Sequence, residues 1–135
     1  MAVKQLSVFI ENRKGMLSEV TDALSDAHIN LRALCLAEAA DYGILRLIVD
    51  DTEKAVGIVR DTGRTVVVND VVGVIVPDTP GGLNLVLHTL NGHDVGIDYM
   101  YAFISKENGK ANVVFRTADV AAADKYLSDA GFELI

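Results

Sequence analysis

The chain has 135 residues, half of them hydrophobic, and its 12 basic and 19 acidic side chains give a formal net charge of −7. This length holds one ordinary domain or two small ones, and the hydrophobic fraction excludes intrinsic disorder. The negative charge argues against nucleic acid and an anionic membrane surface as partners, because both repel an acidic protein.

Residues that could hold a metal or carry out catalysis are scarce. The one cysteine, Cys35, cannot form an internal disulfide, and with three scattered histidines it does not make a zinc site. The sequence contains no phosphate-binding or dinucleotide-binding glycine motif and no nucleophile in a recognisable catalytic setting. We therefore expect no cofactor, no metal ion and no catalytic residue, and so a protein that is not an enzyme.

The expected cellular compartment rests on two kinds of segment that the sequence lacks, a membrane-spanning run and a signal peptide. No apolar run approaches the ~20 residues that span a bilayer. The opening residues run into a strand-like pattern and lack the features of a signal peptide. We expect a cytoplasmic protein.

Two kinds of hydrophobic periodicity alternate along the first half of the chain. Apolar residues occupy every second position at 6–10 and one helical stripe at 16–27, which predicts a strand followed by a helix. Two strand-like runs, 31–37 and 43–49, flank a turn-rich segment that suits an antiparallel hairpin. A short helix around 55–59 ends at Gly63, which suits a left-handed cap, and a strand follows at 65–68. The predicted order is βαββαβ.

The second half of the chain repeats this order. The segment Val8 to Leu17 recurs as Val74 to Leu83, at an offset of 66 residues. The expected strands are 71–76, 97–103, 110–116 and 132–135, and the expected helices are 83–90 and 123–130. We predict an α+β protein of two ferredoxin-like modules, residues 1–69 and 70–135, each an antiparallel sheet with two helices on one face.

The two modules are expected to depend on each other. A copy of about 67 residues falls below the ~70 to 80 at which one core supplies much stability. We therefore expect the modules to pack side by side into a joint antiparallel sheet. The second strand of each module is an edge in this topology, and exposed edges attract partners. Small residues on 31–37 and large ones on 97–103 favour these two strands as the seam.

The loop between the first strand and first helix of each module stands out because it is duplicated. Its residues are Asn12-Arg13-Lys14-Gly15 in one copy and Asp78-Thr79-Pro80-Gly81-Gly82 in the other. A glycine at a helix entry lets a ligand approach the backbone, where free N–H groups suit a carboxylate. Asn12 or Asp78 can accept hydrogen bonds from an ammonium group, so the loop suits a free amino acid. Ordinary turn chemistry also explains such glycines, and both interpretations stay open here.

The segment from Val8 to Val20, followed by Ile29-Asn30-Leu31, resembles the opening of an ACT domain, and Pro77 to Leu83 resembles a second one. The similarity covers practically the whole chain, which is therefore similar to a stand-alone tandem ACT protein. The resemblance implies the fold predicted above, an amino acid bound between paired modules, a homodimer, and regulation of a partner enzyme of amino-acid metabolism. The ligand-binding residues that we expect are Asn12, Arg13, Lys14, Gly15, Met16, Leu17, Asn30, Asp78, Thr79, Pro80, Gly81, Gly82 and Leu83.

Two departures from the ACT pattern distinguish the copies. Lys14 replaces the proline that usually precedes the loop glycine, whereas Pro80 keeps it. Asp78 places a negative charge where the first copy has the neutral amide of Asn12. Because a ligand carboxylate is repelled by Asp78 unless its ammonium group lies between them, we predict two unequal sites.

Two other functions remain open. One is a scaffold that holds an enzyme subunit or a homodimer together through its sheet edges, with vestigial ligand sites. The other is an enzyme on a ferredoxin-like frame, such as an acylphosphatase type, which would use Arg13 with Asn12 or Asn30. Only one of the duplicated loops has such an arginine, which argues against the enzyme.

Overall fold

The computed structural model describes residues 2–135 and divides them into two compact units. One unit comprises Lys4–Asn69, and the other comprises Asp70–Ile135 together with Ala2 and Val3. Among these residues no helix has the length and apolar character that crossing a bilayer requires.

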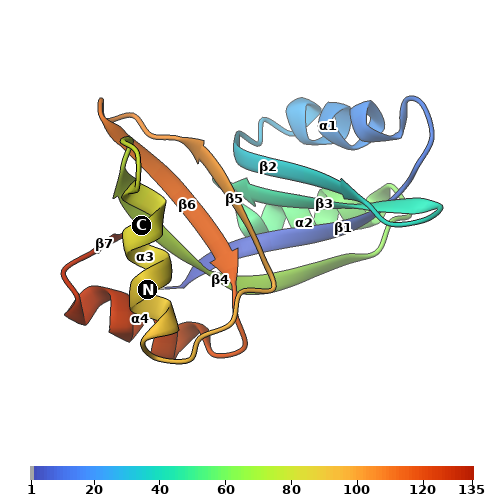
Figure 1. The fold of residues 1–135 in the computed structure, drawn as a ribbon. Helices are drawn as coiled ribbons and strands as arrows, with labels where there is room; N and C mark the ends of the chain where they lie inside the picture. The colour runs from blue at the N-terminus through green and yellow to red at the C-terminus, as the bar shows by residue number, and fades with distance from the viewer. Residues whose placement is uncertain (1) are drawn as a thin grey trace. The chain divides into compact units, whose positions relative to one another are not determined.

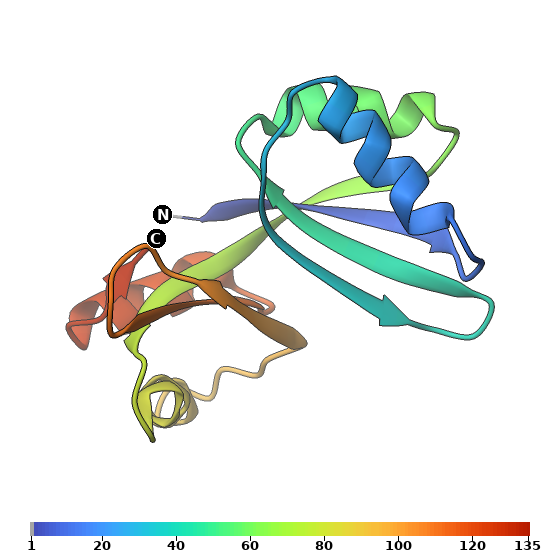
Figure 2. The ribbon, with the colours of Figure 1, turned by 90° about the horizontal axis from the view of Figure 1, so that it is seen from above.

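The unit Lys4–Asn69 has the predicted βαββαβ order. Its elements are β1 (Val3–Glu11), α1 (Met16–Asp26), β2 (Leu31–Glu38), β3 (Tyr42–Val49), α2 (Thr52–Asp61) and the start of β4 (Val66–Pro77). The strands lie in the order β2-β3-β1-β4, and β3 pairs antiparallel with both β1 and β2. Helices α1 and α2 cover one face of this sheet (Figures 1 and 2).

The core of this unit lies between its sheet and its two helices. Alternate residues of β1 turn their side chains to the helices, as the two-residue period predicts. The helical stripe at 16–27 supplies the facing side chains, because residues three and four apart share one side of a helix. The fully buried members include Leu6, Val8, Val20, Leu24, Leu45, Leu47, Ala55 and Val59.

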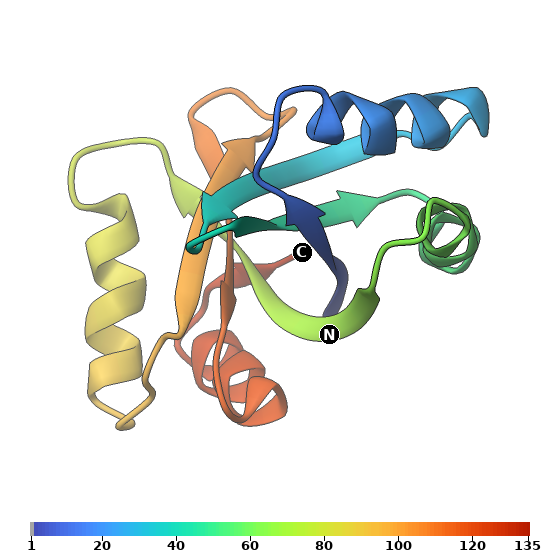
Figure 3. The same cartoon turned by 90° about the vertical axis from the view of Figure 1, so that its right-hand side faces the viewer.

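The unit that contains Asp70–Ile135 repeats this architecture. After β4 come α3 (Gly82–Asn91), β5 (Tyr99–Ile104), β6 (Lys110–Arg116), α4 (Val120–Asp129) and β7 (Glu133–Leu134). The strand order is β7-β4-β6-β5, and every recorded pair is antiparallel. Helices α3 and α4 (yellow and red in Figure 3) pack against each other and against the sheet in one shared core. The predicted fold class of two ferredoxin-like modules is confirmed.

Strand β4 is a single strand where the sequence predicted two. The segments 65–68 and 71–76 belong to the 12-residue strand Val66–Pro77, so the prediction of separate strands is wrong. The two polar residues between them have partners within their own units. Asn69 accepts a hydrogen bond from the Ser7 hydroxyl at 2.9 Å, and the Asp70 carbonyl accepts one from Arg116 at 2.6 Å. Because no glycine or proline intervenes, the backbone stays extended across the boundary.

Two boundaries near the chain end also differ from the prediction. β5 begins at Tyr99 rather than at Ile97, and the last strand shrinks to Glu133–Leu134. Strands β2 and β5 end the strand orders of their own units, as predicted for edges. Pairing between second strands stays a prediction.

Candidate functional site

The two duplicated loops share one hydrogen-bond framework. The N–H group of Asn12 donates to the Asp41 carbonyl at 3.2 Å, and that of Asp78 donates to the Gly109 carbonyl at 2.8 Å. Each loop is thereby tied to the hairpin turn of its own unit. In each loop one backbone N–H group also donates to the carbonyl three residues earlier. Met16 donates to Arg13 in the first loop, and Gly82 donates to Thr79 in the second. We call residues 12–18 the first corner and residues 78–84 the second corner.

Glycine occupies the same left-handed conformation at both corners. Gly15 has φ +88° and Gly81 has φ +85°, a region that other residues adopt only with strain. A Cβ added at either glycine would meet nothing within 4 Å, so packing does not require the glycine. Turn chemistry therefore explains why glycine stands here, and a ligand must be argued from other features.

The first and second helices of each unit begin differently. Helices α2 and α4 begin after Asp51 and Asp119, whose side chains accept hydrogen bonds from the backbone N–H groups of Lys54 and Ala122. Such a cap satisfies part of the open helix terminus. Helices α1 and α3 begin after Gly15 and Gly81, and neither has a side-chain cap. The uncapped terminus thus falls at the duplicated loop both times.

Several backbone N–H groups are consequently open at each corner. Within the described part of the chain, these groups have no hydrogen-bond acceptor: Gly15, Leu17 and Ser18 at the first corner, and Gly81, Leu83 and Asn84 at the second. Most of these residues are solvent-exposed. Such N–H groups at the positive end of a helix dipole favour an anion, and a carboxylate fits them.

Two pockets flank the first corner. One has a volume of about 370 Å³ and combines apolar and charged side chains; its lining residues are Ile10, Glu11, Asn12, Arg13, Leu17, Leu36, Glu38 and Gly43. The other, of about 390 Å³, is mainly apolar and is lined by Gly15, Leu17, Ser18, Thr21, Leu31, Leu34, Leu45 and Leu47. Leu17 lines both pockets, so the helix entry separates a pocket of mixed character from a mainly apolar one.

The structure brings most of the expected residues of the first copy together, but not Asn30. Asn30 lies immediately before β2, beyond the far end of α1, and lines a different pocket with His28 and Ile29. Its backbone exchanges hydrogen bonds with Asp50. The 11 residues of α1 separate it from the loop by roughly 16 Å. Sequence proximity to the motif does not bring Asn30 into the corner.

The two corners differ in the first residue of their helices. Met16 extends its sulfur toward the guanidinium groups of Arg13, at 3.6 Å, and Arg64, at 3.4 Å. Gly82 occupies the equivalent place in the second corner, where the Pro77 carbonyl lies so close that a Cβ would collide with it. At the second corner the first helical residue therefore has no room for a side chain, and no sulfur contacts an arginine there.

Several pocket residues lie outside the expected set. They are Glu11, Leu36, Glu38 and Gly43, and they join Asn12 and Arg13 because β1 and β2 end where β3 begins. The pairing of Ile10 with Gly43 and of Leu36 with Leu45 fixes this meeting point. The sequence could have indicated these residues, because the turn of the hairpin predicted at 31–49 had to lie beside the end of the first strand. Among the described residues no cluster of His, Cys, Asp or Glu could hold a metal ion.

The family model of the ACT domain pair matches residues 1–130. The crystal structure of protein BT0572 from Bacteroides thetaiotaomicron is 44% identical, covers 100% of this chain and 92% of that one, and has a TM-score of 0.93. No curated protein sequence matches the chain.

Two regulatory subunits of aspartate kinase are also similar. The ligand-free subunit from Thermus thermophilus is 13% identical, with a TM-score of 0.70 and coverage of 95% of this chain and 92% of that one. The subunit from Thermus flavus is 13% identical, with a TM-score of 0.64 and coverage of 94% and 91%. At this identity both show similarity of fold alone.

Proposed function

Since this chain belongs to the family of ACT domain pairs, we propose that it binds a free amino acid or a similar small carboxylate and modulates a partner enzyme of amino-acid metabolism. An ACT domain pair is a regulatory module. We propose that the protein works in the cytoplasm, as a homodimer, with no cofactor. Among the described residues β2 pairs with β3 alone, and the other edge of β2 supports the homodimer.

The single observation that carries this proposal is the pair of uncapped helix entries. In each unit the second helix has an aspartate cap, while the first helix leaves its N–H groups open at the duplicated loop. With glycine in place of a capping side chain, each helix entry loses roughly a few tenths of a kcal/mol, and this loss recurs at both equivalent places. A ligand carboxylate that supplies the missing acceptor accounts for both omissions.

The chemistry of the first corner supports an amino acid as the ligand. The carboxylate would accept hydrogen bonds from the open N–H groups at Gly15, Leu17 and Ser18. The ammonium group would donate to the Asn12 side chain, and the acidic residues Glu11 and Glu38 also line this pocket. The ligand side chain would then enter the mainly apolar pocket of about 390 Å³. At the second corner, Asp78 takes the place of Asn12.

Regulation requires no chemical change in the ligand. A bound amino acid shifts an equilibrium between two arrangements only by the difference in its affinity for them. A coupling of ~1 to 3 kcal/mol is typical and changes the affinity for a partner by ~5- to 150-fold. The same coupling applies in reverse, so the partner enzyme would tighten or weaken amino-acid binding by the same factor.

A thermal-shift assay with each of the twenty common L-amino acids tests the proposal. An amino acid at ~100 times its Kd stabilises the folded chain by ~2.7 kcal/mol. With an unfolding entropy of ~2.1 cal/mol/K per residue, this raises Tm by on the order of 10 °C. If none of the twenty amino acids raises Tm, the proposed amino-acid sensing is contradicted. The result would then favour a scaffold that holds partners through its sheet edges.

A pair of matched substitutions locates the site. Asn12→Ala removes the proposed acceptor of the ammonium group from an exposed position, and we expect affinity to fall about tenfold or more. Asn30→Ala makes the same change at an exposed position beyond the far end of α1 and should leave affinity unchanged. Equal effects of the two substitutions would show that the ligand lies elsewhere.

A further inference from the structure

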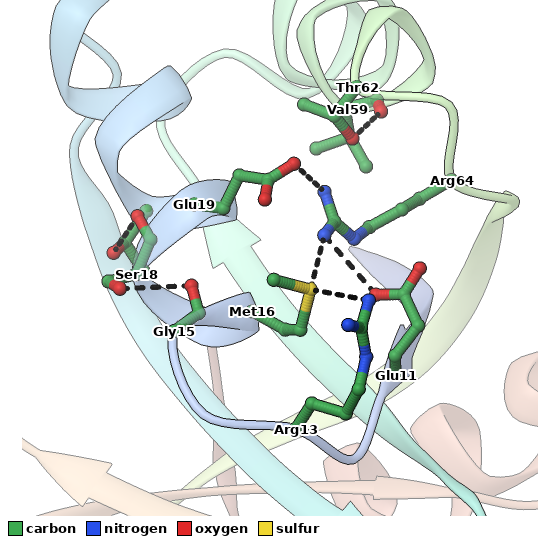
Figure 4. A network of polar contacts seen from close by, with 10 residues as sticks. Glu11, Arg13, Gly15, Met16, Ser18, Glu19, Val59, Thr62 and Arg64 are labelled. Carbon is green, nitrogen blue, oxygen red and sulfur yellow. Dashed lines mark hydrogen bonds and ion pairs between the residues drawn. The ribbon is translucent and has the colours of Figure 1, made fainter.

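Arg64 is a buried charge behind the first corner. It follows Gly63, between α2 and β4, and only 8% of its surface is exposed. Its Nη1 donates to Glu19 at 3.1 Å, and its Nη2 donates to Glu11 at 3.2 Å, so one guanidinium lies between two carboxylates (Figure 4). We call Glu11, Arg64 and Glu19 the clamp.

The two carboxylates of the clamp flank the loop of the first corner. Glu11 is the last residue of β1 and directly precedes Asn12. Glu19 lies in the first turn of α1, and its N–H group donates to the Gly15 carbonyl at 3.1 Å. Because the guanidinium is rigid and planar, holding both carboxylates fixes where the strand ends relative to where the helix begins. The clamp therefore spans the loop whose N–H groups are open.

Stability alone does not explain a guanidinium at this position. Its Nε is buried and has no hydrogen-bond partner among the described residues, which adds to the cost of burying the charge. The partner side chains of Glu11 and Glu19 are 49% and 52% exposed, so water weakens their attraction for the guanidinium. A well-packed apolar side chain in place of a buried ion pair is often neutral or stabilising.

The second copy of the module has an apolar side chain where the first copy has the buried ion pair. Gly63 and Gly131 follow the last helices of their units in the same left-handed conformation, with φ +86° and +91°, so they correspond at an offset of 68 residues. Arg64 therefore corresponds to Phe132, which packs against the core of its own unit. Glu11 and Glu19 correspond to Pro77 and Leu85 by the offset of 66. None of the three charges is present in the second copy, although the two loops share one hydrogen-bond framework. The module thus closes without the clamp, and the clamp is specific to the first corner.

From these contacts we infer that Arg64 is a positioning residue for the first corner. It holds residues 12–15 in the conformation that presents the open N–H groups, and so it sets ligand affinity at this corner and not at the second. The statement about affinity rests on the proposed function, whereas the ordering of the loop is measured without any ligand.

The test compares three variants of the full chain. Arg64→Met keeps an unbranched side chain, though a shorter one, and removes the charge and every donor. Arg64→Lys keeps the charge but lacks the planar fork that bridges two carboxylates. Arg60→Met, at an exposed position of α2, is the matched control for loss of one positive charge. Far-UV circular dichroism verifies that each variant is folded.

Two measurements are made on each variant. Backbone ¹⁵N relaxation gives order parameters for residues 12–15, with Thr79 and Gly81 of the second corner as the internal reference. We expect a fall from ~0.85 to below ~0.6 at the first corner in Arg64→Met, and no change at the reference. NMR titration with each of the twenty common L-amino acids gives the Kd at each corner. If one molecule in ten keeps the competent loop, the apparent Kd at the first corner rises about tenfold.

The outcomes separate the two proposals. Unchanged order parameters in Arg64→Met overturn the positioning role, whatever binds. Binding at the first corner that is equally tight in Arg64→Met and the unaltered chain also overturns it, as does an equal loss in Arg60→Met. Partial recovery in Arg64→Lys supports the role of the charge. If no amino acid binds the unaltered chain while the loop loosens in Arg64→Met, the proposed function fails and the positioning of the loop stands.

Discussion

The substitution Gly82→Ala tests the reason why the two corners differ. A Cβ at Gly82 would collide with the backbone carbonyl of Pro77, and a backbone group has no alternative rotamer through which to move away. The equivalent position of the first corner holds Met16, a long side chain with room to extend. We therefore expect the second corner to reject even one added methyl group.

Two opposing terms set the size of the effect. Replacing a helical glycine by alanine stabilises a helix by roughly 0.5–1 kcal/mol, because the unfolded chain loses freedom. Forcing a methyl group into a filled space costs about 1–3 kcal/mol, since the backbone must shift. The net expectation for Gly82→Ala is a loss of up to about 2.5 kcal/mol, toward the upper end because the obstacle is backbone. Gly57→Ala is the matched control, because a Cβ there would meet nothing within 4 Å, and it should gain roughly 0.5–1 kcal/mol.

Native-state amide hydrogen exchange, resolved by residue, measures the free energy of opening for each unit separately. Gly82→Ala should lower the protection of β4 and β6 residues in the unit that contains Asp70–Ile135. Gly57→Ala should raise protection in the unit Lys4–Asn69. Equal or higher protection in Gly82→Ala would refute the reasoning, because it would show that the Pro77 carbonyl yields without cost.

Three further predictions concern the caps, one carboxylate and the two corners. Asp51→Ala and Asp119→Ala should each lower the free energy of unfolding by about 1 kcal/mol in thermal melts, through loss of an N-cap. The pKa of Glu11 lies below its ordinary value of 4.5, chiefly through a backbone hydrogen bond and then, against desolvation, through Arg64 and Arg13. The stabilisation that Glu11 confers is therefore complete above pH 4.5 and is lost as pH falls through the lowered pKa. In Arg64→Met the pKa of Glu11, measured by NMR titration, should rise. Calorimetric titration with an amino acid should show that the two corners bind it with different affinities. Two equal, independent sites would contradict this prediction.

Local periodicity in the sequence was sufficient to predict the order of elements. Alternation at 6–10 and the helical stripe at 16–27 each report which face is buried, because a strand and a helix repeat their faces at different periods. The recurrence of Val8 to Leu17 at Val74 to Leu83 revealed the second module and its matching loop. Strand boundaries were less certain, since nothing local shows that Asn69 and Asp70 find partners within their own units.

The sequence by itself determined the two modules and both loop glycines, because the hydrophobic pattern and the demand for a left-handed residue are local properties of the chain. Only the tertiary structure decided which distant side chains meet at a corner. It placed Asn30 beyond the far end of α1, brought Glu38 and Gly43 beside Asn12, and set Arg64 between Glu11 and Glu19. These contacts depend on strand register and on which elements end together in space, and no short segment of the sequence encodes them.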